Sequence, residues 1–121
     1  MEECKPMKEF GQLGLTDREV EALARLKQDL SARFPLVDIV IFGSRVRGDS
    51  DLESDLDVLV VLSVPRSHRV RAEVSGIVFE INLDLGTNIS ALVVGSEEWL
   101  DGRLSRSPIK KNVDRDGVSI C

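Results

Sequence analysis

The chain is poor in the residues that build nucleic-acid-binding surfaces. Its 121 residues include four phenylalanines, one tryptophan and no tyrosine, so few aromatic rings are available to stack on bases. The 16 basic residues are outnumbered by 21 acidic residues, and the formal net charge of -5 disfavours broad contact with a phosphate backbone. The composition therefore argues against a nucleic-acid partner and against template-directed polymer synthesis.

Cysteine, histidine and long apolar runs are also scarce. Cys4 and Cys121 lie at opposite ends without metal-ligand spacing; we expect free thiols in a reducing cytosol, although a disulfide between the ends stays open. The single histidine, His68, has no second ligand nearby in the sequence, which disfavours a histidine metal site. No apolar run is long enough for a signal peptide or membrane span. We therefore expect a cytoplasmic protein without a membrane partner.

What the chain does contain is enough for one compact domain. A hydrophobic content of 42% over 121 residues predicts a single domain covering 1–121, with residues 1–14 as a loose N-terminal arm. Thr16 and Glu19 are spaced as a capping box and predict a helix through about Arg33. Its apolar stripe should be Val20, Leu23, Leu26 and Leu30, with Glu19, Arg25, Lys27 and Asp29 facing water.

Further elements alternate in a way typical of an α/β domain. Apolar runs predict strands at about 37–42, 56–62 and 89–94. Helical patterns follow Pro65 as far as about Leu85, with Gly86 as the stop, and at 96–100 and 108–114. A short helical turn is expected at 45–49. The short link between the first two strands favours antiparallel neighbours.

Two carboxylates stand at the head of the second predicted strand. Asp55 and Asp57 are two residues apart, so a strand would place them on one face, roughly 6 to 7 Å apart. Two such anions repel, and a bridging divalent cation is the usual relief unless one takes a proton. The pair therefore predicts a metal site.

A glycine-serine turn follows the first predicted strand. Gly43 permits close backbone approach, and Ser44 supplies a hydroxyl, which together suit phosphate oxygens. An isolated pair of this kind is more often a simple capped turn, but the downstream aspartates favour the phosphate interpretation. Arg45 and Arg47 could pair with a triphosphate or stay solvated.

These residues together resemble a known signature. Phe42-Gly43-Ser44, ten further residues and Asp55-Leu56-Asp57-Val58 are similar to the motif of the DNA polymerase β-like nucleotidyltransferase superfamily. The longer string, with Arg47-Gly48-Asp49 and Ser54, looks most like the minimal nucleotidyltransferase branch. The resemblance implies an α/β fold: a small mixed sheet of three or four strands with flanking helices.

The resemblance also implies an activity. Asp55 and Asp57 would hold Mg²⁺ or Mn²⁺, and Gly43, Ser44 and Arg47 would position the phosphates of ATP. Members of the minimal branch often accompany a HEPN-type protein, so the implied reaction is AMP transfer to a hydroxyl of that partner, with this chain as the antitoxin of a toxin–antitoxin pair.

One position departs from the family pattern. Family members usually carry a third carboxylate on the third strand, and the matching residue here is Ser90. A hydroxyl is a poor base at neutral pH, so a non-catalytic nucleotide-binding or structural antitoxin that acts by contact is the alternative. Transfer to a small molecule would need a substrate-binding domain that the chain does not visibly supply.

Two basic groups of side chains stay open from sequence. His68 lies among arginines at a predicted helix start, where they could meet phosphate, a partner's acidic surface or solvent. The basic tail could cover a sheet edge or meet a partner; its residues are Arg103, Arg106, Lys110, Lys111 and Arg115.

Overall fold

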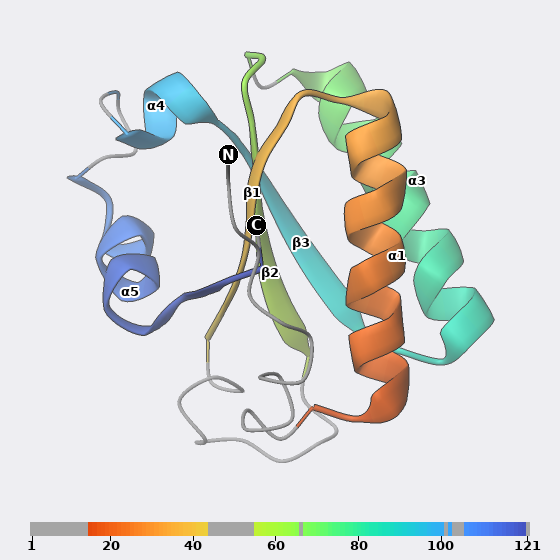
Figure 1. Ribbon diagram of the computed structural model, residues 1–121. Helices are drawn as coiled ribbons and strands as arrows, with labels where there is room; N and C mark the ends of the chain where they lie inside the picture. Colours follow the sequence, from red (N-terminus) through yellow and green to blue (C-terminus); the bar gives the residue numbers. More distant parts are fainter. Residues whose placement is uncertain (1–14, 44–54, 66, 101, 103–105, 121) are drawn as a thin grey trace.

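A computed structural model describes residues 15–43, 55–65, 67–100, 102 and 106–120 (Figure 1). The elements in chain order are α1 (Asp17–Arg33), β1 (Leu36–Phe42), β2 (Leu56–Leu62), α3 (His68–Leu85), β3 (Ile89–Gly95), α4 (Ser96–Leu100), α5 (Pro108–Asp116) and β4 (Val118–Ser119). The predicted elements in the described ranges are therefore present, and most bounds shift by one or two residues. The helical turn expected at 45–49 lies outside the described residues.

The four strands form one mixed sheet in the order β3-β2-β1-β4. β1 runs antiparallel to both β2 and β4, whereas β2 and β3 are parallel. This confirms the predicted α/β class and the predicted antiparallel pairing of the first two strands. The parallel pair is possible because α3 supplies the long crossover connection that parallel strands require.

Helix α1 begins where the sequence predicts. The Thr16 hydroxyl accepts the Glu19 backbone N–H at 3.1 Å, and the Glu19 carboxylate accepts the Thr16 N–H at 3.0 Å. Glu19 was expected to face water, and that prediction is wrong: it is only 6% exposed, because the capping bond folds its side chain back over the first turn. The inward stripe is Ala22, Leu23, Leu26 and Leu30, all fully buried.

Helix α3 is bounded by two local signals. The Ser67 hydroxyl caps its start by accepting the Val70 N–H at 3.2 Å, and Gly86 ends it in the left-handed conformation at φ 68°. Its buried side is Val74, Ile77, Val78 and Ile81. No helix within the described ranges combines the length and apolar character needed to cross a membrane.

The helices lie on both faces of the sheet. α1 and α3 cover one face and enclose the larger apolar core, while α4 and α5 lie over the other (Figure 1). The smaller cluster on that second face is Val40, Leu59, Val61, Val94, Trp99 and Val113. Trp99 is therefore a core residue.

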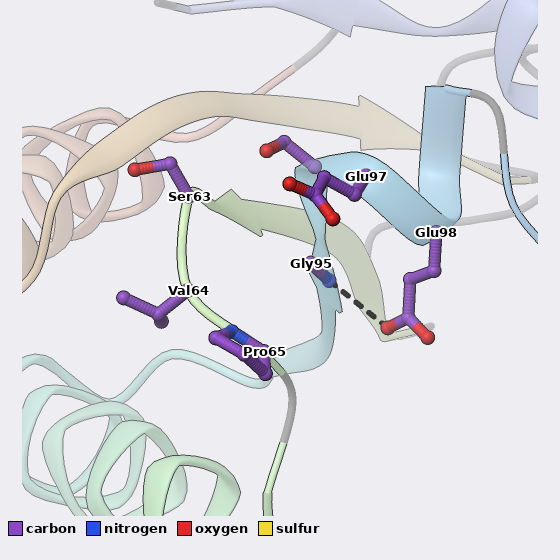
Figure 2. Close-up of a pocket in the computed structure, with 7 residues that line it drawn as sticks. Ser63, Val64, Pro65, Gly95, Glu97 and Glu98 are labelled. Carbon is purple, nitrogen blue, oxygen red and sulfur yellow. Dashed lines mark hydrogen bonds between the residues drawn. The ribbon is translucent and has the colours of Figure 1, made fainter.

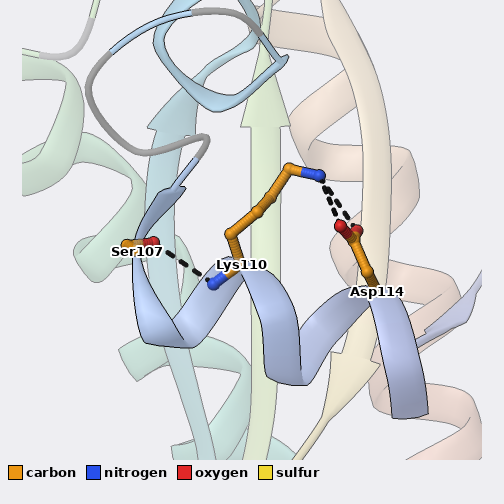
Figure 3. Close-up of polar contacts among 3 residues, drawn as sticks. All are labelled: Ser107, Lys110 and Asp114. Carbon is orange, nitrogen blue, oxygen red and sulfur yellow. Dashed lines mark hydrogen bonds and ion pairs between the residues drawn. The ribbon is translucent and has the colours of Figure 1, made fainter.

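The tail folds back onto the sheet. Ser107 caps α5 by accepting the Lys110 N–H at 3.2 Å (Figure 3). The Lys110 ammonium pairs with Asp114 at 2.7 Å and lies 5.3 Å from the centroid of the Trp99 ring. After α5, β4 pairs with β1. In the described range 106–120, the tail thus covers a sheet edge, one of the two alternatives left open; Arg103 lies outside that range.

Candidate functional site

Three strand ends meet at one end of the sheet. Because β1 and β2 are antiparallel and β2 and β3 are parallel, the end of β1 lies beside the starts of β2 and β3. The register sets Asp57 opposite Phe42 on one side and opposite Ser90 on the other. This is the lower end of the sheet in Figure 1. The predicted motif residues Gly43, Asp55 and Asp57 lie here, at the end of β1 and the start of β2.

Gly43 lies directly against the Asp57 carboxylate. Its φ of +91° is one that side-chain-bearing residues rarely adopt. A Cβ at this position would overlap the Asp57 Oδ2 and lie 3.2 Å from Cγ and 3.3 Å from Cβ. Glycine is therefore required for the turn and for the approach of Asp57. Sequence reasoning had considered a simple turn or a phosphate site for this glycine, and not its contact with Asp57.

Asp57 lies on the sheet face that carries α4 and α5. Successive strand residues alternate between faces, and the next residues on its side, Leu59 and Val61, pack in the cluster around Trp99. Ser90, paired with Asp57 in register, shares this face and is exposed. Ser90 thus lies beside Asp57 on the same face of the sheet, and its match to the family's third carboxylate stays a prediction.

Asp55 is held by a residue that the sequence analysis missed. The Asn88 Nδ2 donates to Asp55 Oδ1 at 2.5 Å, and the Leu56 N–H donates to the Asn88 carbonyl at 3.0 Å. Asn88 therefore joins the start of β2 to the segment before β3 through both side chain and backbone. Its only signal in the sequence is a polar residue two positions before Ser90, which is too weak to assign a role.

The segment that carries Asn88 is itself anchored to α3. The Asn82 Oδ1 accepts the Ile89 N–H at 3.0 Å and the Thr87 hydroxyl at 2.8 Å, and its Nδ2 donates to the Ile89 carbonyl at 3.1 Å. These bonds fix the turn after Gly86 relative to the helix. The position of the Asp55 partner therefore depends on a side chain of α3.

The family model described as nucleotidyltransferase domain matches residues 23–115. The chain belongs to the nucleotidyltransferase domain family. Among curated proteins, no sequence matches this chain significantly.

Solved structures of nucleotidyltransferases share the fold. A protein described as a minimal nucleotidyltransferase is 26% identical, with 85% of this chain and 95% of that chain covered and a TM-score of 0.53. A toxin–antitoxin structure with AMP-PNP is 17% identical, with coverages of 88% and 73% and a TM-score of 0.58. A mutant of the toxin–antitoxin MntA-HpeT is 19% identical, with 84% and 70% covered and a TM-score of 0.53. The predicted nucleotidyltransferase resemblance is thereby confirmed.

The donor set of this nucleotidyltransferase domain suits a hard cation. Asp55 and Asp57 supply carboxylate oxygens at the start of one strand, and Mg²⁺ is commonly held by one or two carboxylates together with substrate phosphates. In the described part of the chain, no group of three or more acidic, histidine or cysteine side chains could hold a metal. Among the described residues, the two aspartates would thus share the cation with oxygens from elsewhere.

Other predicted residues are not part of this cluster or cannot be placed. Ser44 and Arg47, and likewise Arg45, lie outside the described residues, so their phosphate role stays a prediction. His68 is exposed at the first turn of α3, which begins near the end of the sheet where β2 finishes, opposite the aspartates. It is therefore not a ligand of the aspartate pair.

A separate cavity of about 340 Å³ lies at that opposite end (Figure 2). It is lined by the segment after β2, the end of β3 and the start of α4, where Glu98 accepts the Gly95 N–H at 3.0 Å. Its described lining contains the carboxylates of Glu97 and Glu98 and no basic side chain, which disfavours a triphosphate. The cavity therefore does not compete with the strand-end site.

Proposed function

We propose that this chain is a Mg²⁺-dependent nucleotidyltransferase that transfers AMP from ATP to a hydroxyl of a HEPN-type partner protein, as the antitoxin of a toxin–antitoxin pair. Family membership supports the reaction class. The observation that carries the site is the close approach of the Gly43 backbone to the Asp57 carboxylate, since it unites the two halves of the motif. An added Cβ would occupy space that this approach requires.

Each residue has a distinct role in this proposal. Asp55 and Asp57 would hold the cation, with Asn88 orienting the Asp55 carboxylate through its 2.5 Å bond. Gly43 and, by prediction, Ser44 and Arg47 would bind phosphate oxygens next to them. When bound, Mg²⁺ neutralises charge on the triphosphate and on the departing pyrophosphate. The residues of the chain itself position the reacting groups and stabilise their charges.

The transfer reaction needs no reactant besides ATP and the acceptor hydroxyl. The acceptor oxygen forms a bond to the α-phosphorus, the bond from that phosphorus to the bridging oxygen breaks, and pyrophosphate leaves. The hydroxyl proton passes to water or to a base on the partner, because the Ser90 hydroxyl beside Asp57 is a poor base. The position of Ser90 therefore lowers the expected rate without removing the cation ligands.

ATP and the toxin partner are supported by the solved relatives. One is a toxin–antitoxin structure with AMP-PNP, a nucleotide analogue that has the adenine base and triphosphate length of ATP. Another is the toxin–antitoxin pair MntA-HpeT. These relatives share the fold of this chain, and the donor, the acceptor and the HEPN identity of the partner are the proposed extension.

A transfer assay tests the proposal. The chain is incubated with ATP, Mg²⁺ and the co-purified HEPN-type partner, and the intact mass of the partner is measured. We expect one adenylyl group to be added, and expect Asp55→Asn with Asp57→Asn to abolish the addition because both cation ligands are lost. The control Asp29→Asn with Asp114→Asn makes the same charge change at ion pairs away from the site and should retain activity.

A contact-only antitoxin is the second candidate, favoured by the exposed Ser90 in place of a third carboxylate. On this reading the partner stays unmodified but is still inhibited. Full inhibition of the partner's activity by the Asp55→Asn, Asp57→Asn protein, with no mass change, would therefore replace the enzymatic proposal with the contact mechanism.

A further inference from the structure

The outer side of α3 carries an apolar stripe directly opposite its buried side. At 100° per residue, Ala72, Gly76, Phe79 and Leu83 fall on one line along the helix, and all four are exposed. Phe79 is 64% exposed and Leu83 71% exposed, which is more than Val37 or Leu100, the other exposed large apolar residues in the described ranges. Two adjacent large side chains in water on one helix face indicate a contact surface.

The same stripe contains a gap beside those large side chains. A Cβ built on Gly76 would meet nothing within 4 Å, so this position could hold a larger residue without conflict in the isolated chain. A glycine in a helix interior lowers helix stability relative to alanine, so folding of the monomer alone does not favour it. Absence of a side chain here does permit close approach of another helix.

The charges along α3 are also distributed against its own dipole. The first turn contains no acidic residue and the last turn no basic residue, the reverse of the stabilising arrangement. Arg69 near the start has a side chain that is 90% exposed and pairs with Glu73 at 3.5 Å, and Glu80 and Asp84 near the end are exposed. The helix is therefore basic at one end and acidic at the other on its solvent side.

We propose that α3 packs antiparallel against α3 of a second copy of this chain. An antiparallel copy places Phe79 and Leu83 of one helix over Gly76 and Ala72 of the other, so large side chains meet small ones. It also sets the basic start of each helix against the acidic end of its partner. The same patch on both copies thus supplies complementary shapes and complementary charges, as a two-fold symmetric interface requires. This proposal does not depend on the nucleotidyl-transfer activity.

The expected dimer is weak and reversible. Stable interfaces bury about 800 Å² per partner, and one helix face offers less than that. We therefore expect a dissociation constant on the order of tens of micromolar, which sedimentation equilibrium of the purified full chain can measure.

Three substitutions test the packing. Phe79→Ala should weaken association at least tenfold, while Leu100→Ala, which removes a similarly exposed leucine (61%) from α4, should leave it unchanged. Gly76→Leu separates specific packing from general stickiness, because it adds apolar surface but fills the gap. Specific packing predicts at least tenfold weaker association, and stronger association would overturn the proposal.

Charge exchange tests the orientation. Arg69→Glu alone and Asp84→Arg alone should each weaken self-association, because like charges then meet across the interface. An equal mixture of the two variants should restore dimerisation to the unmodified level, since each pair is again opposite in sign. Asp84 also pairs with Arg25 at 2.9 Å and Arg69 with Glu73 at 3.5 Å, so thermal unfolding of both variants is measured to check that the fold is retained.

Three further results would reject the proposal. One is a monomer at all concentrations up to about 1 mM, far above the expected dissociation constant. The others are a mixture that does not associate and a mixture that associates much more strongly than the unmodified chain. The last result would indicate parallel helices. A monomeric chain whose Phe79→Ala variant loses binding to a different protein would assign the stripe to that protein instead.

Discussion

Replacing Gly43 with alanine should destabilise the fold through two separable terms. The first is the backbone: at φ +91°, an L-residue with a Cβ costs about 1 to 2 kcal/mol. The second is steric, because the new Cβ would overlap Asp57 Oδ2 and lie 3.2 Å from Cγ. Displacing a packed side chain adds about 1 to 2 kcal/mol, so the expected loss of unfolding free energy is about 2 to 4 kcal/mol.

Two matched variants separate these terms. Gly86 also has positive φ, at +68°, but its added Cβ would meet only the flexible end of Arg18, at 3.3 Å. Gly86→Ala should therefore show the backbone term alone, about 1 to 2 kcal/mol. Asp57→Ala removes the overlapping oxygen, so Gly43→Ala made in that background should cost about as much as Gly86→Ala.

Urea unfolding followed by circular dichroism gives the four free energies of this double-mutant cycle. We expect Gly43 and Asp57 to be coupled by about 1 kcal/mol or more, and Gly86 and Asp57 to be uncoupled. A Gly43–Asp57 coupling below about 0.5 kcal/mol would refute the reasoning, because it would mean that the Asp57 carboxylate does not limit the space at Gly43.

Three other substitutions probe the remaining parts of the site and fold. Asn88→Ala should lower Mg²⁺-ATP affinity several-fold by calorimetry while changing stability by less than about 1 kcal/mol, because its bond to Asp55 is exposed; unchanged affinity would remove its positioning role. Ser90→Asp should lower the melting temperature without Mg²⁺, and adding Mg²⁺ should restore it, since a carboxylate beside Asp57 needs a cation. If Mg²⁺ does not restore the melting temperature, residues 57 and 90 do not share one face of the sheet. Glu19→Ala should cost about 0.5 to 2 kcal/mol of thermal stability through loss of the capping box, and a neutral result would show that the cap is dispensable.

Local signals were sufficient to predict most of the fold. The Thr16 capping box and the left-handed Gly86 are properties of a few adjacent residues, so the ends they mark could be read from the chain. The failure at Glu19 has the same local origin. Its charge suggested exposure, but the capping bond that its spacing also predicts folds the carboxylate inward.

The candidate site was predicted in part. The spacing of Gly43 and the Asp55, Asp57 pair indicated one cluster, and the register brings these residues together. Asn88 was not found, because an asparagine between a helix and a strand is common in ordinary turns. Its contact with Asp55 spans 33 residues and depends on the anchoring of that turn by Asn82.

By itself, the sequence determined the element types, the inward faces and the pairing of a glycine turn with two aspartates. These follow from short-range periodicity and spacing, which neighbouring residues set directly. Only the tertiary structure decided the register that places Ser90 beside Asp57 and Gly43 against its carboxylate. The physical reason is that sliding a strand by two residues preserves its alternating pattern, so only packing between distant segments selects one register.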